Sequence, residues 1–342
     1  MTLGCQANRL GAFGSLTLAN VFIKAMAIKS FLHRENKKLE SAMAIKNFLQ
    51  TLLQLLLGAG FCVGLCSPLA LAQQFTQRLY PGVAPGSEDW VFEELVRNAD
   101  AGTSVYYNVR NPVLSAYLPD PESSSATALI ILPGGALRFL TIGQETREII
   151  DFLNARGIAV FLLKYRVLQE DPNAPRPPSI GPGRLPQLEI VNGNANPMPD
   201  HEGLSRVLEL GIDDAQEALR VIRAHAQEWN IDPNRVGFLG ISAGGGLALG
   251  ALIENKPGLT PDFVASLFGP SLMDVVLPEE TPPLFMVTET GHGPVTAGLI
   301  ALLQIWIEAG EAAELLVFDV PRIWNGLWQD RFLQWMQEQD LR

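Results

Sequence analysis

The residues most able to do chemistry in this sequence are Gly240-Ile241-Ser242-Ala243-Gly244, which form a G-x-S-x-G motif. A serine hydroxyl becomes an effective nucleophile only when a neighbouring base removes its proton. A continuous apolar run over 236–242 leads into the serine, and small residues that can open a helix follow it. Glycines on both sides allow a sharp strand-to-helix turn that holds the serine in a strained conformation. We therefore interpret Ser242 as a candidate nucleophile, against the simpler interpretation of a glycine-rich turn without chemistry.

A second glycine-rich segment could stabilise the oxyanion that forms when a serine attacks a carbonyl group. Such an oxyanion needs two or more preset N–H donors. The amide of Ala243, directly after the nucleophile, is the first candidate donor. Gly134-Gly135-Ala136 follow another apolar run and precede a helical pattern. We expect the amides of Gly135 and Ala136 to be the other donors, although a plain glycine turn would give the same sequence.

Both turns need a rigid scaffold, and the sequence predicts a buried parallel sheet. Unbroken apolar runs of strand length suggest strands that are buried on both faces. Apolar residues three and four apart predict helices between these runs. The alternation predicts an α/β fold with a doubly wound, mostly parallel sheet and helices on both faces. The expected strands are 127–135, 158–165, 236–242, 263–270, 283–289 and 314–320; the expected helices are 144–156, 213–229, 243–254 and 296–310.

Two further segments complete this expected architecture. Residues 104–121 resemble an antiparallel hairpin that leads into the sheet. Residues 168–210 are rich in Pro, Gly and Asn, and so long an irregular stretch inside a domain is usually a lid or an insertion. Because it follows the strand that ends at Tyr165, it should begin at the carboxyl edge of the sheet, where ligands of open α/β folds bind.

Several of these segments resemble the α/β-hydrolase family, most of all its secreted branch of acetylxylan-esterase-like carbohydrate ester hydrolases. The resemblance covers roughly 104–336, and the block 213–245 is its most specific part. It is also carried by "PGGALRFL" (133–140), "KYRV" (164–167) and "WQDRFLQWM" (328–336). The resemblance implies the α/β-hydrolase fold. It also implies cleavage of acyl esters of carbohydrates or small esters through an acyl-serine, with a Ser-Asp-His triad.

The chain departs from that family at both partners of the serine. The acid would follow the strand at 282–287, where "TETGHGPV" (288–295) supplies Glu289 as its one carboxylate. The histidine would fall at about Ile323. His292, in the loop after a central strand, is therefore the first candidate base, with Glu289 as the acid.

Other candidates for the missing partners remain open. His201 lies in the insertion and could serve as the base if that segment folds over the site, and Asp274 is a second candidate acid. His225 should lie on a helix far from the carboxyl edge. If no histidine serves Ser242, the chain would be a catalytically degenerate protein of this fold that binds a glycan or a protein partner. The tryptophans at 324, 328 and 335 fit a sugar-binding surface or, more simply, the packing of a last helix.

The acidic character of the chain and the lack of metal-binding or nucleotide-binding motifs limit the kinds of partner that we expect. The chain has a net charge of −11, and residues 1–72 hold seven of its 25 Lys and Arg but two of its 36 Asp and Glu. The remainder is therefore strongly acidic, which excludes nucleic acid as an expected partner. The sequence has no HExxH, EF-hand or P-loop motif. We therefore expect no metal and no other cofactor, and an ester of a small molecule or a polysaccharide as the partner.

The amino-terminal residues suggest export. From Met43, one lysine is followed by a long apolar run and then by Ala70-Leu71-Ala72. This layout predicts a signal peptide at 43–72 that is cleaved after Ala72, and hence a secreted or periplasmic protein. An uncleaved membrane anchor is the alternative, because 48–72 is long enough to span a bilayer. Residues 1–42 are expected to be a spurious or duplicated leader, and 73–342 a single domain.

Overall fold

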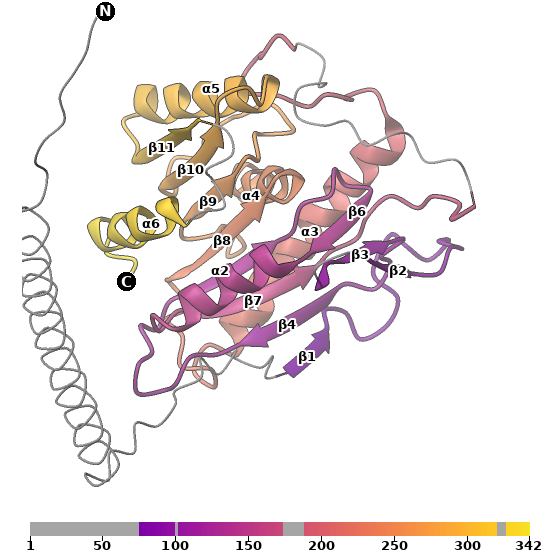
Figure 1. Cartoon of the computed structure of the whole chain (residues 1–342), viewed down its shortest axis with the longest axis horizontal. Helices are drawn as coiled ribbons and strands as arrows, with labels where there is room; N and C mark the ends of the chain where they lie inside the picture. Colours follow the sequence, from indigo (N-terminus) through magenta and orange to yellow (C-terminus); the bar gives the residue numbers. More distant parts are fainter. Residues whose placement is uncertain (1–74, 100–101, 174–187, 320–325) are drawn as a thin grey trace, which may run out of the picture. The chain divides into compact units, whose positions relative to one another are not determined.

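An eight-stranded sheet forms the centre of the computed structural model, which describes residues 75–99, 102–173, 188–319 and 326–342. The strands lie in the order β1-β4-β7-β5-β8-β9-β10-β11, and this row can be followed in Figure 1. Strand β4 is antiparallel to both of its neighbours, whereas all pairs from β7 to β11 are parallel. The strands are β1 Phe75–Arg78, β4 Val113–Tyr117, β5 Ala128–Leu132, β7 Ala159–Lys164, β8 Val236–Ile241, β9 Val264–Leu267, β10 Leu284–Glu289 and β11 Ala313–Phe318.

The six apolar runs in the sequence correspond to β5, β7, β8, β9, β10 and β11, which confirms the predicted parallel sheet. All residues of β5 and β9 are buried, as is every residue except the last in β7, β8 and β10. Continuous runs of apolar side chains are needed because helices cover both faces of these strands. Strand β11 lies at the edge of the sheet and is only partly buried.

Two groups of helices cover the sheet. Apolar side chains of α3, α4 and α5 pack into one buried cluster, and those of α2 and α6 pack into a second cluster on the other face. The bounds are α2 Gln144–Asn154, α3 Glu202–Ala224, α4 Ala243–Glu254, α5 Pro294–Ala309 and α6 Leu327–Glu338. The prediction of helices on both faces is therefore confirmed. Trp328 and Trp335 of α6 are 1% and 2% exposed, so they pack in the core, while residue 324 lies outside the described residues.

Helix α3 differs from its prediction by several residues at each end. Helix α3 begins at Glu202, eleven residues before the expected start, and ends at Ala224. The first turns were assigned to the insertion because Pro, Gly and Asn dominate the residues just before them. However, Val207, Leu208 and Ile212 continue the apolar face of the helix and are buried. The irregular part of the insertion therefore ends at His201, and residues 174–187 of it lie outside the described residues.

The predicted hairpin over 104–121 is wrong. Strand β3 (Ser104–Tyr107) pairs with β2 (Leu95–Asn98) and β6 (Phe139–Ile142) in a separate three-stranded sheet, whereas β4 belongs to the main sheet. Asn108, between β3 and β4, is buried and exchanges two hydrogen bonds with the backbone of Glu170. This tertiary contact fixes the end of β3 away from β4, so the two strands join different sheets.

A buried ion pair ties the segment before β2 to the main sheet. Arg166, just after β7, and Asp214 of α3 are 1% and 0% exposed, and their side chains approach to 2.7 Å. Arg166 also donates hydrogen bonds to the carbonyl groups of Pro85 and Leu210. The Tyr80 hydroxyl donates to Asp214 at 3.0 Å. Because the charges and nearly all their donors and acceptors are paired, burial of this ion pair is tolerated.

The described residues all belong to one compact unit of the chain. Among their helices, none is long and apolar enough to cross a bilayer. The expected leader and signal peptide, residues 1–72, lie outside the described residues.

Candidate active site

Ser242 lies at the sharp turn between β8 and α4. Its backbone has φ 52° and ψ −123°, a region that non-glycine residues rarely adopt, and its side chain is exposed. The Ser242 N–H donates to the Leu267 carbonyl at 2.8 Å, and the Ser242 carbonyl accepts from Gly245 at 2.8 Å. The strained turn expected from the motif is therefore present. It places the hydroxyl at the carboxyl edge of the sheet, next to the positive end of the α4 dipole.

The two glycines of the motif are required by close packing around this turn. A Cβ atom on Gly240 would lie 2.4 Å from the Gly244 carbonyl oxygen, and one on Gly244 would lie 2.1 Å from the Leu132 carbonyl oxygen. No side chain fits at either distance. The missing side chains thus let the first turn of α4 rest directly on the ends of β5 and β8.

The glycine turn after β5 lies beside Ser242. A Cβ atom on Gly134 would be 3.2 Å from the Cβ atom of Ser242. Gly135, Ala136 and Leu137 all have positive φ values, at 151°, 54° and 61°. The buried Tyr165 hydroxyl donates to the Pro133 carbonyl at 2.6 Å and fixes the start of the turn. The turn leads into the short strand β6, and not directly into a helix as expected from the sequence.

Three N–H groups at these turns are available as donors. Among the described residues, the amides of Gly135, Ala136 and Ala243 donate no hydrogen bond to another protein group. Two belong to the turn that touches Ser242, and the third follows Ser242 directly. Unpaired N–H groups at a helix start and in a strained turn form a site that favours an anionic oxygen.

His292 and Glu289 lie at the same edge, beyond β9. Glu289 is the last residue of β10, and its Oε1 atom is 3.9 Å from Nδ1 of His292. The two side chains are 13% and 16% exposed. Within the described residues, the buried Nδ1 atom has no hydrogen-bond partner. Burial lowers the pKa of His292, and the negative charge of Glu289 partly opposes this shift. His292 is therefore neutral at neutral pH, as a general base must be.

A ring contact connects His292 to the surroundings of Ser242. The Phe268 and His292 rings have centroids 5.7 Å apart. Phe268 directly follows Leu267, whose carbonyl holds the Ser242 N–H. The Ser242 hydroxyl itself forms no hydrogen bond with any side chain in the described part of the chain. The structure therefore places His292 at the carboxyl edge of the sheet, where Ser242 also lies, but the two side chains form no hydrogen bond.

The other candidate partners have structural roles. His201 is the N-cap of α3, and its Nδ1 atom accepts from the Leu204 N–H at 3.2 Å. Asp274 accepts hydrogen bonds from Asn194 and Asn192, which hold its pKa below the ordinary value and fix the end of the insertion. His225 caps the other end of α3, at the amino edge, and stacks on Trp229. Ile323 lies outside the described residues.

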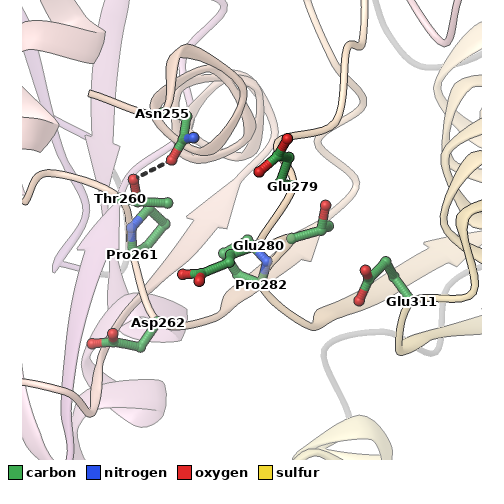
Figure 2. A pocket seen from close by; sticks show the side chains of 9 residues that line it. Asn255, Thr260, Pro261, Asp262, Glu279, Glu280, Pro282 and Glu311 are labelled. Atoms are coloured by element: carbon green, nitrogen blue, oxygen red, sulfur yellow. Dashed lines mark hydrogen bonds between the residues drawn. The ribbon is translucent and has the colours of Figure 1, made fainter. Parts of the chain in front are cut away.

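A hollow of about 690 Å³ lies at the opposite, amino edge of the sheet. Figure 2 shows its lining, to which Asp262, Glu279, Glu280 and Glu311 contribute carboxylates. Asp262 is paired with Arg223 at 2.9 Å. Ser242, Glu289 and His292 lie at the other end of the strands, so this hollow is separate from the candidate site. Nowhere in the described part of the chain do three or more His, Cys, Asp or Glu side chains gather as a metal site requires.

Comparison with known proteins agrees with this arrangement. Residues 206–297 match the family model for the alpha/beta hydrolase fold. The crystal structure of an acetyl ester-xyloside bifunctional hydrolase from Caldicellulosiruptor lactoaceticus superposes with a TM-score of 0.51, at 18% identity, over 79% of this chain and 98% of that one. The protein has the α/β-hydrolase fold.

Two other proteins also resemble this chain. An acetylxylan esterase of Xylanibacter ruminicola is 29% identical over 128 residues, which cover 37% of this chain. The matched region spans 19% of the length of that esterase. A lipase/esterase from Lactobacillus plantarum superposes with a TM-score of 0.49, at 16% identity, over 73% of this chain and 98% of that one.

The sequence pointed to the two turns but not to everything that supports them. The positive φ values of Ala136 and Leu137 were missed, since neither residue type is usual in that conformation. The bond from Tyr165 to Pro133 was also missed, although both residues lie in segments quoted for the resemblance. A tyrosine at the end of a buried strand needs a partner for its hydroxyl, and this was the available signal.

Proposed function

We propose that this protein is a serine ester hydrolase that cleaves acyl esters of carbohydrates or small esters. The observation that carries the proposal is the exposed Ser242 in a strained turn, with three unpaired amides beside it. A turn that served only to connect β8 to α4 would not need a serine at a positive φ. The similarity of 128 residues to an acetylxylan esterase supports an acetylated carbohydrate as the substrate class.

In the proposed reaction, the Ser242 Oγ atom attacks the ester carbonyl carbon while His292 accepts the hydroxyl proton. Because Nδ1 of His292 faces Glu289, Nε2 is the nitrogen that would take this proton. The amides of Gly135, Ala136 and Ala243 hold the carbonyl oxygen as its negative charge develops. The C–O bond then breaks, and the alcohol leaves with the proton from His292. Water, activated by the same base, hydrolyses the acyl-serine and releases the acid.

This mechanism requires two movements. The Nδ1 atom of His292 must approach Glu289 by about 1 Å to form a normal hydrogen bond. The imidazole must also come within hydrogen-bond distance of the Ser242 hydroxyl. Catalytic hydrogen bonds often tighten only when the substrate is bound. The negative charge of Glu289 would then stabilise the imidazolium that forms during attack.

We also propose that the protein acts outside the cytoplasm. The apolar run after Met43 and the Ala-x-Ala pattern before Gln73 support export by a cleaved signal peptide. A polymeric carbohydrate cannot cross a membrane, so an enzyme that deacetylates one must be exported to meet it. Mass spectrometry of the amino terminus in a secreting host would test this, with Gln73 as the expected first residue.

The experiment that tests the activity compares the full-length chain with its Ser242→Ala variant on p-nitrophenyl acetate. Loss of the nucleophile should lower kcat/KM about 10³-fold or more. Ser123→Ala is a matched control, because this serine is exposed in the loop before β5, at the amino edge. Equal rates for the wild type and Ser242→Ala would contradict the proposal.

A second candidate function is binding of a glycan or a protein partner without catalysis. It is favoured by one observation: the Ser242 hydroxyl has no bond to a base in the described residues, and Nδ1 of His292 has no partner. A wild-type rate no higher than that of Ser242→Ala, together with saturable binding of a xylo-oligosaccharide, would favour this function.

A further inference from the structure

Two aromatic side chains lie beside the oxyanion turn. Tyr107 of β3 and Phe139 of β6 are direct partners across the three-stranded sheet. Their ring centroids are 5.6 Å apart and their planes meet at 48°. Both side chains are partly exposed. They therefore form a small aromatic surface, which we call the Tyr107–Phe139 pair.

Short contacts connect this pair to the nucleophile. A Cβ atom on Gly135 would lie 1.7 Å from the Phe139 carbonyl oxygen and 3.0 Å from Cδ2 of its ring. Gly135 is the neighbour of Gly134, whose own Cβ position is 3.2 Å from the Cβ atom of Ser242. The aromatic pair thus borders the turn that would hold the oxyanion.

The two faces of the small sheet differ. Side chains alternate along a strand, so Tyr106 and Leu140 point to the face opposite to Tyr107 and Phe139. Leu140 is fully buried in the core of the domain. The Tyr107–Phe139 pair therefore occupies the outer face. The same face carries Arg97, an exposed residue whose guanidinium carbon lies 5.8 Å from the centroid of the Tyr107 ring.

We propose that the Tyr107–Phe139 pair, with Arg97 beside it, binds the sugar ring of an acylated carbohydrate substrate. This inference rests on the proposed function and adds a location for the sugar. A pyranose ring has faces of C–H groups and a rim of hydroxyl groups. The C–H groups carry a small positive charge and are attracted to the negative face of an aromatic ring. Arg97 can donate hydrogen bonds to the hydroxyl rim.

The chemistry of this surface fits a sugar better than a long acyl chain. A fatty acyl chain would need a continuous apolar groove and would gain nothing from a guanidinium group. The aromatic pair is small, and an exposed cation and the hydroxyl-bearing Thr141 lie on the same face. A pyranose ring has apolar C–H faces and a polar rim, so its binding requires an aromatic surface next to hydrogen-bond donors.

The test compares two acetyl esters, acetylated xylotriose and ethyl acetate, by titration of the released acid. Ethyl acetate has neither a sugar nor an aromatic leaving group. The measured quantity is the ratio of kcat/KM for the sugar ester to kcat/KM for ethyl acetate. Tyr107→Ala should lower this ratio about five- to tenfold. Tyr107→Phe, which keeps the ring, should preserve it. Val96→Ala is the control, because Val96 is 46% exposed on the opposite face of the same sheet.

The outcomes separate this inference from the proposed function. An unchanged ratio in Tyr107→Ala would overturn the inference even if Ser242 is the nucleophile. If the wild-type chain cleaves neither ester, the proposed function fails, and calorimetric titration with xylotriose decides about the surface. Binding that is lost in Tyr107→Ala but kept in Val96→Ala would support the inference. Binding that is absent in the wild type or equal in all three would overturn it.

Discussion

The two sides of the candidate active site are built in different ways. On one side, Ser242 and the Gly134–Leu137 turn are fixed by backbone contacts, buried hydrogen bonds and positions where no side chain fits. On the other side, His292 and Glu289 meet through side chains alone, at 3.9 Å. The side with Ser242 is therefore preorganised, whereas the side with His292 would have to tighten for the proposed reaction. Preorganised hydrogen-bond donors account for a large part of catalysis in ester hydrolysis. In the proposed reaction, the Ser242 side would therefore contribute most of the catalytic effect that the rigid backbone can provide.

The most direct test of this comparison is to remove His292, the proposed base. His292→Ala should lower kcat/KM for p-nitrophenyl acetate by about 10²–10⁴-fold, the usual contribution of a general base. His201→Ala should keep the rate, because His201 serves as the N-cap of α3. Its loss should instead lower the free energy of unfolding by about 1 kcal/mol. Steady-state kinetics and denaturant titration measure both effects.

The rate of the His201→Ala variant also shows whether the base lies in the insertion or in the loop after β10. A large loss of rate in His201→Ala, with His292→Ala unaffected, would place the base in the insertion. The loop after β10 would then have no part in proton transfer.

A second prediction concerns the preorganised side. Gly135→Ala would place a methyl group 1.7 Å from the Phe139 carbonyl oxygen, so the turn must move and its amides must lose their alignment. We expect kcat to fall about 10²–10³-fold, as for the loss of an oxyanion donor. Gly82→Ala is the control, since nothing lies within 4 Å of the added atom. A Gly135→Ala variant with the wild-type kcat would show that this turn does not hold the oxyanion.

The smallest expected effect concerns the charge of Glu289. The neutral imidazole is the active form, so the rate should fall as the pH drops through the pKa of His292, which burial places below its ordinary value. Glu289 raises that pKa, and Glu289→Gln should move the acid limb of the pH–rate profile to lower pH. At pH 8, the rate of Glu289→Gln should be lower than that of the wild type by less than about a hundredfold, which is the smallest loss expected for removal of the base. An acid limb that stays in place would show that Glu289 and His292 do not interact.

The same division explains how much the sequence could predict. Unbroken apolar runs determined the six parallel strands, and G-x-S-x-G determined the turn at Ser242, because both signals are local. The glycine turn at 134–137 was found for the same reason, and its oxyanion role stays a prediction. The pairing of β3 was not predictable, since it depends on Asn108 meeting the backbone of Glu170, 62 residues away.

The roles of the histidines were less accessible from the sequence. His201 and His292 lie among ordinary loop residues in the sequence, whereas His225 falls in a predicted helix. No local pattern separates a helix cap from a base. The structure assigns caps to His201 and His225 through their contacts. For His292, the structure shows a location at the carboxyl edge and a nearby carboxylate, that of Glu289. These observations favour His292 among the candidate bases, and its role as base stays a proposal.

The left-handed backbone at Ser242 has a consequence for how this sequence can change over generations. At φ 52° and ψ −123°, a glycine would relieve local strain that serine must bear. Selection for stability alone would therefore favour the replacement of Ser242 by glycine, which needs a single codon change from some serine codons. A lineage that retains serine here accepts a permanent loss of stability, and would do so only while the hydroxyl is in use.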